Sequence, residues 1–236
     1  MDKVAIIGGT GLYNLNFLQD SHEEVIETEY GKTAIYRGKS DGREIIFLPR
    51  HGIEHDSLAY QVNFKANMQA LANLNIKKVL ATCAAGSLNY NMEVGDIVLL
   101  DQFMDLAWNR ESTFGEYSVN MTNPYCEKLR NNYIEAAKEK NIKIHPYGNM
   151  IVTGGPRYET ALEVEVFKNW GMDVVGMTNS TEATLARELG LCYSAISVVT
   201  DMAAGLTKVE PDLALHKKVF NENIQKVIDL LEAAVS

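Results

Sequence analysis

Apolar residues recur along this chain with two different periods. Short runs rich in valine, isoleucine and leucine, bounded by glycine or polar residues, predict buried β-strands. The expected strands cover residues 3–8, 32–38, 43–49, 78–84, 96–102, 148–153, 173–177 and 192–200. Longer amphipathic stretches predict helices at 61–75, 124–140, 159–170, 180–189 and 212–234. Strands that alternate with helices predict an α/β fold with a central sheet covered on both faces.

The C-terminal segment shows the helical pattern most clearly, whereas one internal segment shows no pattern. The apolar residues of 212–234 form a single helical stripe, made of Phe220, Ile224, Val227, Ile228 and Leu231. The stretch 103–123 lacks a clean period and is predicted to be a long functional loop. No linker rich in proline, glycine or serine divides the chain, so we expect one domain over residues 1–236.

Composition restricts the classes of partner. The chain has 236 residues with a net charge of −9, so a general nucleic-acid binder or a binder of acidic membranes is excluded, because either needs a basic face. No apolar run approaches the roughly 20 residues of a membrane span. Cys83, Cys126 and Cys192 show no C-x-x-C spacing, which predicts free thiols in a reducing compartment. We therefore expect a cytoplasmic protein.

A glycine-containing segment follows the first predicted strand. Residues 9–14 satisfy only two of the three glycines in the dinucleotide fingerprint, with Asn14 in the third place, so a dinucleotide site is disfavoured. Backbone N–H groups of glycines after a strand do converge on anions, and Thr10 adds a hydroxyl donor. The segment therefore predicts a site for phosphate or a phosphate ester. The alternative is a plain strand-to-helix turn.

A second segment with chemical potential follows the strand at 43–49. Arg50 and His51 are adjacent at its end, where a guanidinium group and an imidazole can share one phosphate. Residues 51–55 also match the H-x-x-E-H pattern of zinc peptidases, which requires a helix. Pro49 and Gly52 disfavour that helix, so the phosphate interpretation is preferred over a metal site or a structural histidine pair.

Several further segments extend these two across nearly the whole chain. They are residues 63–67, 82–88, 95–98, 101–103, 155–160, 176–183 and 200–201. Their order and spacing resemble those of the purine nucleoside and 5'-methylthioadenosine phosphorylases. The resemblance implies a single-domain α/β fold with a central mixed β-sheet flanked by helices, and a homotrimer. It also implies an enzyme with no metal and no cofactor, in which inorganic phosphate is a co-substrate.

The resemblance also implies a role for individual residues. The phosphate site would consist of Thr10, Arg50, His51, the backbone around Cys83 and Ala84, and Thr178. Met177 would lie against the ribose, while Glu159, Asp201 and Ala203 would face the base. Two positions depart from the family pattern. Cys83 stands where a hydroxyl residue is expected, and Thr181 stands where the family usually has proline.

Asp201 is the predicted catalytic residue. Cleavage of the bond to purine N9 builds negative charge on the base, so a carboxylic acid beside N7 stabilises the departing base without a metal. The alternative for Asp201 is a carboxylate that caps a turn at a strand end. The resemblance also implies that Asp201 selects 6-aminopurines, whereas Glu159 and Ala203 are more typical of members that act on 6-oxopurines. A carboxylate at position 159 accepts well from the N1–H of a 6-oxopurine.

The 5' end of the substrate is recognised by an apolar or a histidine side chain in this family, and Leu215 and His216 are neighbours in the relevant helix. We interpret the chain as a phosphorylase that converts 5'-methylthioadenosine to adenine and 5-methylthioribose 1-phosphate. The alternative within the family is a 6-oxopurine nucleoside or 5'-methylthioinosine phosphorylase. The alternatives outside it are a metallopeptidase and a non-catalytic nucleoside-binding protein.

Overall fold

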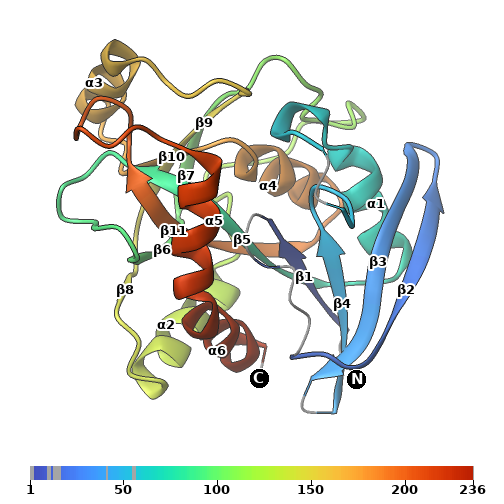
Figure 1. Ribbon diagram of the computed structural model, residues 1–236. Helices are drawn as coiled ribbons and strands as arrows, with labels where there is room; N and C mark the ends of the chain where they lie inside the picture. Colours follow the sequence, from blue (N-terminus) through green and yellow to red (C-terminus); the bar gives the residue numbers. More distant parts are fainter. Residues whose placement is uncertain (1–2, 10–11, 13–16, 41, 55–56, 236) are drawn as a thin grey trace.

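A computed structural model describes residues 3–9, 12, 17–40, 42–54 and 57–235, and a central mixed β-sheet crosses the molecule (Figure 1). Its strands are β1 (Val4–Gly8), β2 (Gln19–Thr28), β3 (Gly31–Ser40), β4 (Arg43–Pro49), β5 (Lys78–Ser87), β6 (Ile97–Leu99), β7 (Gln102–Leu106), β8 (Ile144–His145), β9 (Asn149–Thr153), β10 (Val174–Gly176) and β11 (Cys192–Met202). The longest path through the sheet runs β2-β3-β4-β1-β5-β10-β9-β7, and β11, β6 and β8 branch from β5. The predicted fold class is confirmed.

Strand β5 joins the two parts of the sheet. Its first residues pair in parallel with β1, its last two pair antiparallel with β10, and β11 runs parallel to it along its length. Because β1, β5 and β11 are parallel, their carboxyl ends lie at one edge of the sheet. That edge is where α/β proteins place their ligands.

Helices cover both faces of the sheet (Figure 1). They are α1 (Phe64–Asn73), α2 (Glu127–Glu139), α3 (Ala161–Asn169), α4 (Asn179–Glu188), α5 (Leu213–Glu222) and α6 (Ile224–Ala234), with a 3-10 turn η1 at Ala59–Gln61. Apolar residues of α1 and α4 belong to one core cluster, and those of α2, α5 and α6 belong to another. The apolar residues of α3 pack in a smaller cluster with β9 and β10.

Three strands and one helix break were not predicted. Strand β2 is polar and mostly exposed at the sheet edge, β8 has two residues, and all of β7 except Gln102 lies in the stretch 103–123 that was predicted as a loop. The single helix predicted at 212–234 is two helices that meet at Asn223. The Asn223 side chain donates to the carbonyl of Val219 at 3.0 Å. Such a side-chain bond to the backbone competes with a continuous helix.

The prediction of three free thiols is wrong for two of them. Cys126 and Cys192 form a disulfide, and only Cys83 is a free cysteine among the described residues. The two partners are 66 residues apart in sequence, but the start of α2 lies against the start of β11, where the N–H of Cys126 donates to the carbonyl of Tyr193. Sequence spacing could not reveal this contact. The argument from free thiols for a reducing compartment no longer applies to this pair.

Opening this disulfide is expected to lower the free energy of unfolding by about 2–4 kcal/mol, because the cross-link restricts the unfolded chain. We expect a lower Tm for the Cys126→Ser/Cys192→Ser variant and for the wild type in a dithiol reductant. The control is the same reductant added to the double variant, whose Tm should not fall further. Equal Tm values for the wild type and the double variant would contradict the prediction.

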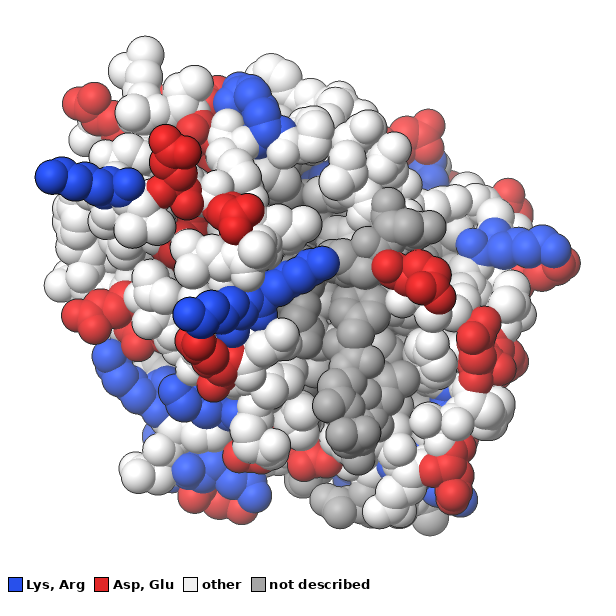
Figure 2. Space-filling model, in the orientation of Figure 1, with Lys and Arg blue, Asp and Glu red and all other residues white. Residues whose placement is uncertain are grey.

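The surface agrees with the charge of the chain. On the face shown in Figure 2, acidic and basic side chains are interspersed and do not form one basic area. Within the described residues, no helix combines the length and the apolar character that a bilayer crossing requires.

Candidate active site

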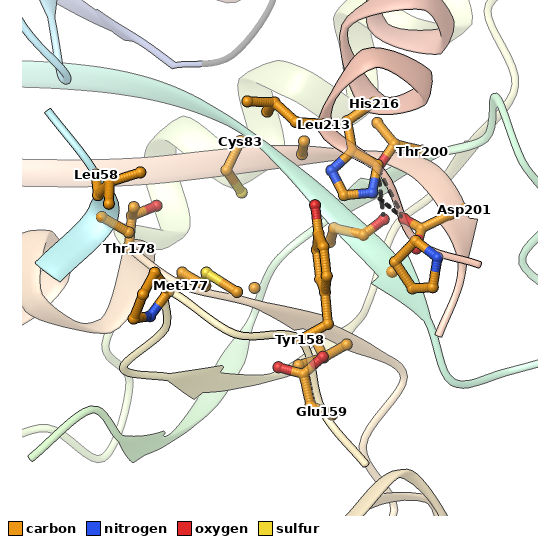
Figure 3. A pocket seen from close by; sticks show the side chains of 18 of the residues that line it. Leu58, Cys83, Tyr158, Glu159, Met177, Thr178, Thr200, Asp201, Leu213 and His216 are labelled. Carbon is orange, nitrogen blue, oxygen red and sulfur yellow. Dashed lines mark hydrogen bonds and ion pairs between the residues drawn. The ribbon is translucent and has the colours of Figure 1, made fainter. Parts of the chain in front are cut away.

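A pocket of about 330 Å³ lies at the carboxyl ends of β5, β10 and β11, and the turn after β4 closes one side (Figure 3). It brings together nine of the ten predicted site residues. These are Arg50, His51, Cys83, Ala84, Glu159, Met177, Thr178, Asp201 and Ala203. The tenth, Thr10, lies outside the described residues. Residues that are far apart in sequence therefore share one cavity.

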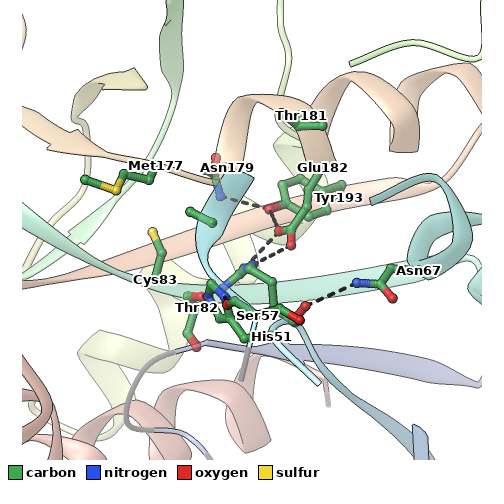
Figure 4. Close-up of polar contacts among 12 residues, drawn as sticks. His51, Ser57, Asn67, Thr82, Cys83, Met177, Asn179, Thr181, Glu182 and Tyr193 are labelled. Carbon is green, nitrogen blue, oxygen red and sulfur yellow. Dashed lines mark hydrogen bonds and ion pairs between the residues drawn. The ribbon is translucent and has the colours of Figure 1, made fainter. Parts of the chain in front are cut away.

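Arg50 is held by a buried carboxylate (Figure 4). Its Nε lies 2.5 Å from Oε1 of Glu182 and its Nη2 lies 2.9 Å from Oε2, while Nη1 donates to the carbonyl of Thr82 at 2.7 Å. Burial alone would lower the pKa of Arg50, but the Glu182 carboxylate raises it above its usual value. Both side chains are almost fully buried. Arg50 is therefore a permanently charged and fixed donor at the pocket wall.

The position of the Arg50 guanidinium group requires a glycine at position 9. A methyl group at position 9 would lie 2.3 Å from Nη1 of Arg50, so any larger residue would displace the guanidinium group. The glycine after β1 thus has a packing role in addition to the anion-binding role predicted for its segment.

His51 is oriented by the chain that follows it. Its Nδ1 lies 2.9 Å from the carbonyl of Ser57, and because a carbonyl only accepts, Nδ1 carries the proton. Residues 50–54 form turns, so the helix that the H-x-x-E-H interpretation needs does not exist over the described part of the motif. His55 lies outside the described residues.

Cys83 occupies the pocket wall without offering a strong donor. Its thiol lies 3.8 Å from the carbonyl of Ile196, at the distance of a weak hydrogen bond. Burial raises the pKa of the Cys83 thiol to about 11, so it stays protonated at neutral pH. At this position the neighbouring backbone is the stronger candidate for an anion contact, since a thiol donates weakly.

Met177 and Thr178 connect β10 to α4. Thr178 is the residue before the first turn of α4, and its hydroxyl does not cap that helix. The N-terminus of a helix carries a partial positive charge, which favours anions. A methyl group at Gly155, where φ is +63°, would lie 2.8 Å from the sulfur of Met177. This glycine lets the thioether reach the pocket.

Asp201 follows a β-bulge. The register of β11 against β5 shifts between Val199 and Asp201, and bulges of this kind re-aim side chains next to functional sites. The Thr200 hydroxyl donates to Oδ1 of Asp201 at 3.0 Å, and Nε2 of His216 lies 3.1 Å from the same oxygen. The His216 ring is not aligned for a hydrogen bond to it. The carboxyl is almost completely buried.

Glu159 lies across the pocket from His216 (Figure 3). Thr153 donates to Oε1 of Glu159 at 2.8 Å. Burial raises the pKa of the Glu159 carboxyl, and this effect exceeds the opposing hydrogen bond from Thr153. Ala203 is buried and its N–H donates to the carbonyl of Ser87, so it adds shape and no polar side chain to the pocket.

The raised pKa of Glu159 predicts how the stability of the fold depends on pH. The protonated carboxyl adds to the free energy of unfolding, and this contribution is complete below the unfolded pKa of about 4.3. It is lost as the pH rises through the pKa of the folded state. We expect the Tm of Glu159→Gln minus the Tm of the wild type to increase as the pH rises from about 4 to 8, in phosphate-free buffer. The amide keeps the acceptor for Thr153. A Tm difference that does not change with pH would contradict the assignment.

Several pocket residues were not predicted. Tyr158 projects into the cavity and its ring lies 5.5 Å from that of His216, edge to face (Figure 3). Of the neighbours Leu215 and His216, His216 lines the pocket together with Leu213, and Leu215 is not among its described lining residues. The spacing of 213 and 216 by three residues places them on one face of α5, a signal that the sequence did contain.

Arg110 comes from the stretch predicted to be a functional loop. Its Nε donates to the hydroxyl of Thr181 at 2.8 Å, and its Nη1 donates to the carbonyl of Met177 at 2.6 Å. The stretch that contains Arg110 therefore fixes the backbone of Met177, which lines the pocket. Thr181, at the position where the resemblance led us to expect proline, supplies the acceptor for the first of these bonds.

Comparison with known proteins agrees with this geometry. A family model described as the phosphorylase superfamily matches residues 3–236. The probable 6-oxopurine nucleoside phosphorylase of Dictyoglomus turgidum is 43% identical, with 99% of this chain and 90% of the relative covered. The S-methyl-5'-thioadenosine phosphorylase of Pyrococcus horikoshii is 40% identical, and the match covers 100% of this chain and 92% of the relative.

A solved structure resembles the whole chain. The methylthioadenosine phosphorylase from Schistosoma mansoni, in complex with adenine, has a TM-score of 0.95 and 33% identity, and the match covers 100% of this chain and 91% of that one. The chain belongs to the phosphorylase superfamily. The family and the enzyme class predicted from the sequence are confirmed.

Proposed function

We propose that this member of the phosphorylase superfamily cleaves the N-glycosidic bond of purine nucleosides with inorganic phosphate and releases the base and a sugar 1-phosphate. One observation carries the proposal. Anion donors and carboxyl groups line opposite walls of a single pocket, with Thr178 on one side, Asp201 on the other and Met177 between them (Figure 3). A nucleoside and a phosphate can meet in such a pocket.

The chemistry needs positioned charge at both ends of the breaking bond. Positive charge develops on the sugar as the bond to N9 lengthens, and a phosphate anion near Arg50, His51 and Thr178 stabilises it. Negative charge develops on the purine, and a proton or hydrogen bond at N7 stabilises that charge. Thr200 and His216 both contact Oδ1 of Asp201, so we assign Oδ2 to the base.

We propose 5'-methylthioadenosine as the substrate, with adenine and 5-methylthioribose 1-phosphate as products. Asp201 suits a 6-aminopurine because an oxygen of its carboxyl group can accept from the exocyclic amino group while its proton serves N7. Leu58 and Leu213 give the pocket apolar side chains for a methylthio group. Curated relatives with this activity, such as that of Pyrococcus horikoshii, support the assignment.

Two residues favour a 6-oxopurine nucleoside as the alternative substrate. His216 lines the pocket and offers a polar group to a 5'-hydroxyl. Glu159 accepts well from the N1–H of a 6-oxopurine, whereas adenine has no hydrogen at N1. The relative from Dictyoglomus turgidum carries a name of this type.

A phosphorolysis panel tests the proposal. The substrates are methylthioadenosine, methylthioinosine, adenosine, inosine and guanosine, each with and without phosphate, and sugar 1-phosphate is quantified. We expect cleavage only with phosphate and the highest kcat/KM for methylthioadenosine. Equal cleavage without phosphate would refute phosphorolysis, and a higher kcat/KM for inosine or methylthioinosine would select the alternative. Activity should persist in excess chelator.

We further propose that the enzyme needs no metal or cofactor and assembles as a homotrimer. Charged and polar side chains of the pocket supply donors for the phosphate, and the family resemblance supports the trimer. Light scattering of the purified protein measures the assembly directly. The cytoplasmic location stays a prediction. The disulfide does not contradict it, because intracellular proteins of hyperthermophiles contain disulfides.

A further inference from the structure

A chain of buried polar groups leads from Tyr125, just before α2, to Arg50. Figure 4 shows its middle part, Asn179, Tyr193 and Glu182. The Tyr125 hydroxyl donates to Oδ1 of Asn179, and Nδ2 of Asn179 donates to the Tyr193 hydroxyl at 2.8 Å. Tyr193 in turn donates to Oε2 of Glu182 at 2.7 Å, and Glu182 holds Arg50. None of the five residues is more than 3% exposed. The orientation of the Asn179 amide is assigned so that its oxygen accepts from Tyr125 and its nitrogen donates to Tyr193.

Each bond in this chain fixes the next. Asn179 donates to the Tyr193 oxygen, so the Tyr193 proton is directed to Glu182. That carboxylate receives three donors in total, two from Arg50 and one from Tyr193. In a buried setting such bonds strengthen one another, and the orientation of one group depends on the others. The direction of the Arg50 fork therefore depends on the Tyr193 hydroxyl.

The two tyrosines are also fixed to each other. Their rings stack with centroids 6.2 Å apart, and each tyrosine is next in sequence to one cysteine of the disulfide. The N–H of Cys126 donates to the carbonyl of Tyr193 at 2.7 Å. The backbone that carries the tyrosines is therefore fixed by a covalent link and a hydrogen bond.

We propose that Tyr193 is a positioning residue for phosphate: acting through Glu182, its hydroxyl sets the orientation in which Arg50 meets the anion, and Asn179 and Tyr125 hold that hydroxyl in place. This inference rests on the proposed function, since it assigns the anion at Arg50 to phosphate. Tyr193 is not among the described residues that line the pocket. Its effect is therefore expected on phosphate alone and not on the nucleoside.

Tyr193→Phe is the test because it keeps the buried ring and removes only the hydroxyl. We expect KM for phosphate to rise about tenfold, KM for the nucleoside to stay within twofold, and Tyr125→Phe to shift the phosphate KM in the same direction by less. The matched control is Tyr133→Phe. Tyr133 is fully buried on α2, and its hydroxyl has no hydrogen-bond partner among the described residues. Its loss should leave both KM values unchanged.

Calorimetric titration of the nucleoside-free protein with inorganic phosphate separates the inference from the proposed function. A Tyr193→Phe variant that binds phosphate as tightly as the wild type overturns the inference alone, as does an equal rise in both KM values. A wild type that binds no phosphate and cleaves nucleosides without it overturns the proposed function and the inference together.

Discussion

Replacing Asp201 with alanine is expected to lower kcat by roughly 10²–10⁴-fold and to change the nucleoside KM much less. In the proposed mechanism the contact of this carboxyl with the purine strengthens as the base acquires negative charge, so its loss affects the transition state more than the bound substrate. Asp201 packs at the end of a strand and not in an apolar core cluster, so the fold should persist. Steady-state kinetics with saturating phosphate measure both constants.

The matched control is Glu210→Gln, which removes one exposed carboxylate next in sequence to the pocket residue Pro211. We expect its kcat to stay within about twofold of the wild type, since a surface charge change has little effect on a buried site. A similar loss of activity in both variants would mean that net charge, and not the position of Asp201, controls the rate.

Asp201→Asn tests base selection at the same position. An amide cannot give up a proton, but it can donate a hydrogen bond to O6 or N7 of the base. We therefore expect the ratio of kcat/KM values to shift from 6-amino toward 6-oxo nucleosides, assisted by Glu159. If the Asn variant keeps the wild-type preference, base selection depends on Glu159 and the segment around Ala203.

Glu182→Ala is expected to lower the free energy of unfolding by about 3–5 kcal/mol, because it leaves the Arg50 charge buried without its partner. The phosphate KM should rise as well, since the bond from Nη1 to the Thr82 carbonyl alone then orients the guanidinium group. Chemical denaturation measures the stability of the folded variant. A variant as stable as the wild type would show that water or another group compensates Arg50.

The double variant Glu182→Met/Arg50→Met separates the structural role of the pair from its chemistry. Replacing both charges with apolar side chains of similar size removes the unpaired charge, and stability should return to within about 1 kcal/mol of the wild type or exceed it. Activity should not return, because the variant lacks Arg50, the proposed phosphate donor. Recovery of both would contradict the role of Arg50.

The residues at strand ends were predictable from sequence. Arg50 follows β4, and Asp201 lies near the end of β11, so a buried run that stops on a polar residue was enough to find each. Glu182 and His216 come from helices that approach this edge from the two faces of the sheet. Glu182 lies in a helix that is buried on several sides, and its spacing alone does not show which cation it meets.

Other features depend on contacts that no local pattern contains. Strand β2 is polar and mostly exposed, so neither an apolar run nor a buried face marked it. The disulfide depends on the meeting of α2 and β11, and the pair of tyrosines beside it looks like ordinary core in the sequence. Periodicity identifies the elements, whereas the partner of each buried polar group requires the tertiary structure.

The central position of β5 has a consequence for synthesis of the chain. Its parallel neighbour β11 begins only at Cys192, long after β5 ends at Ser87, and β11 also carries Asp201. A nascent chain that lacks β11 therefore exposes an unpaired edge of a largely apolar strand, which is a template for aggregation. We expect fragments truncated before residue 192 to aggregate and to require a chaperone to stay dispersed, however well their first four strands pair.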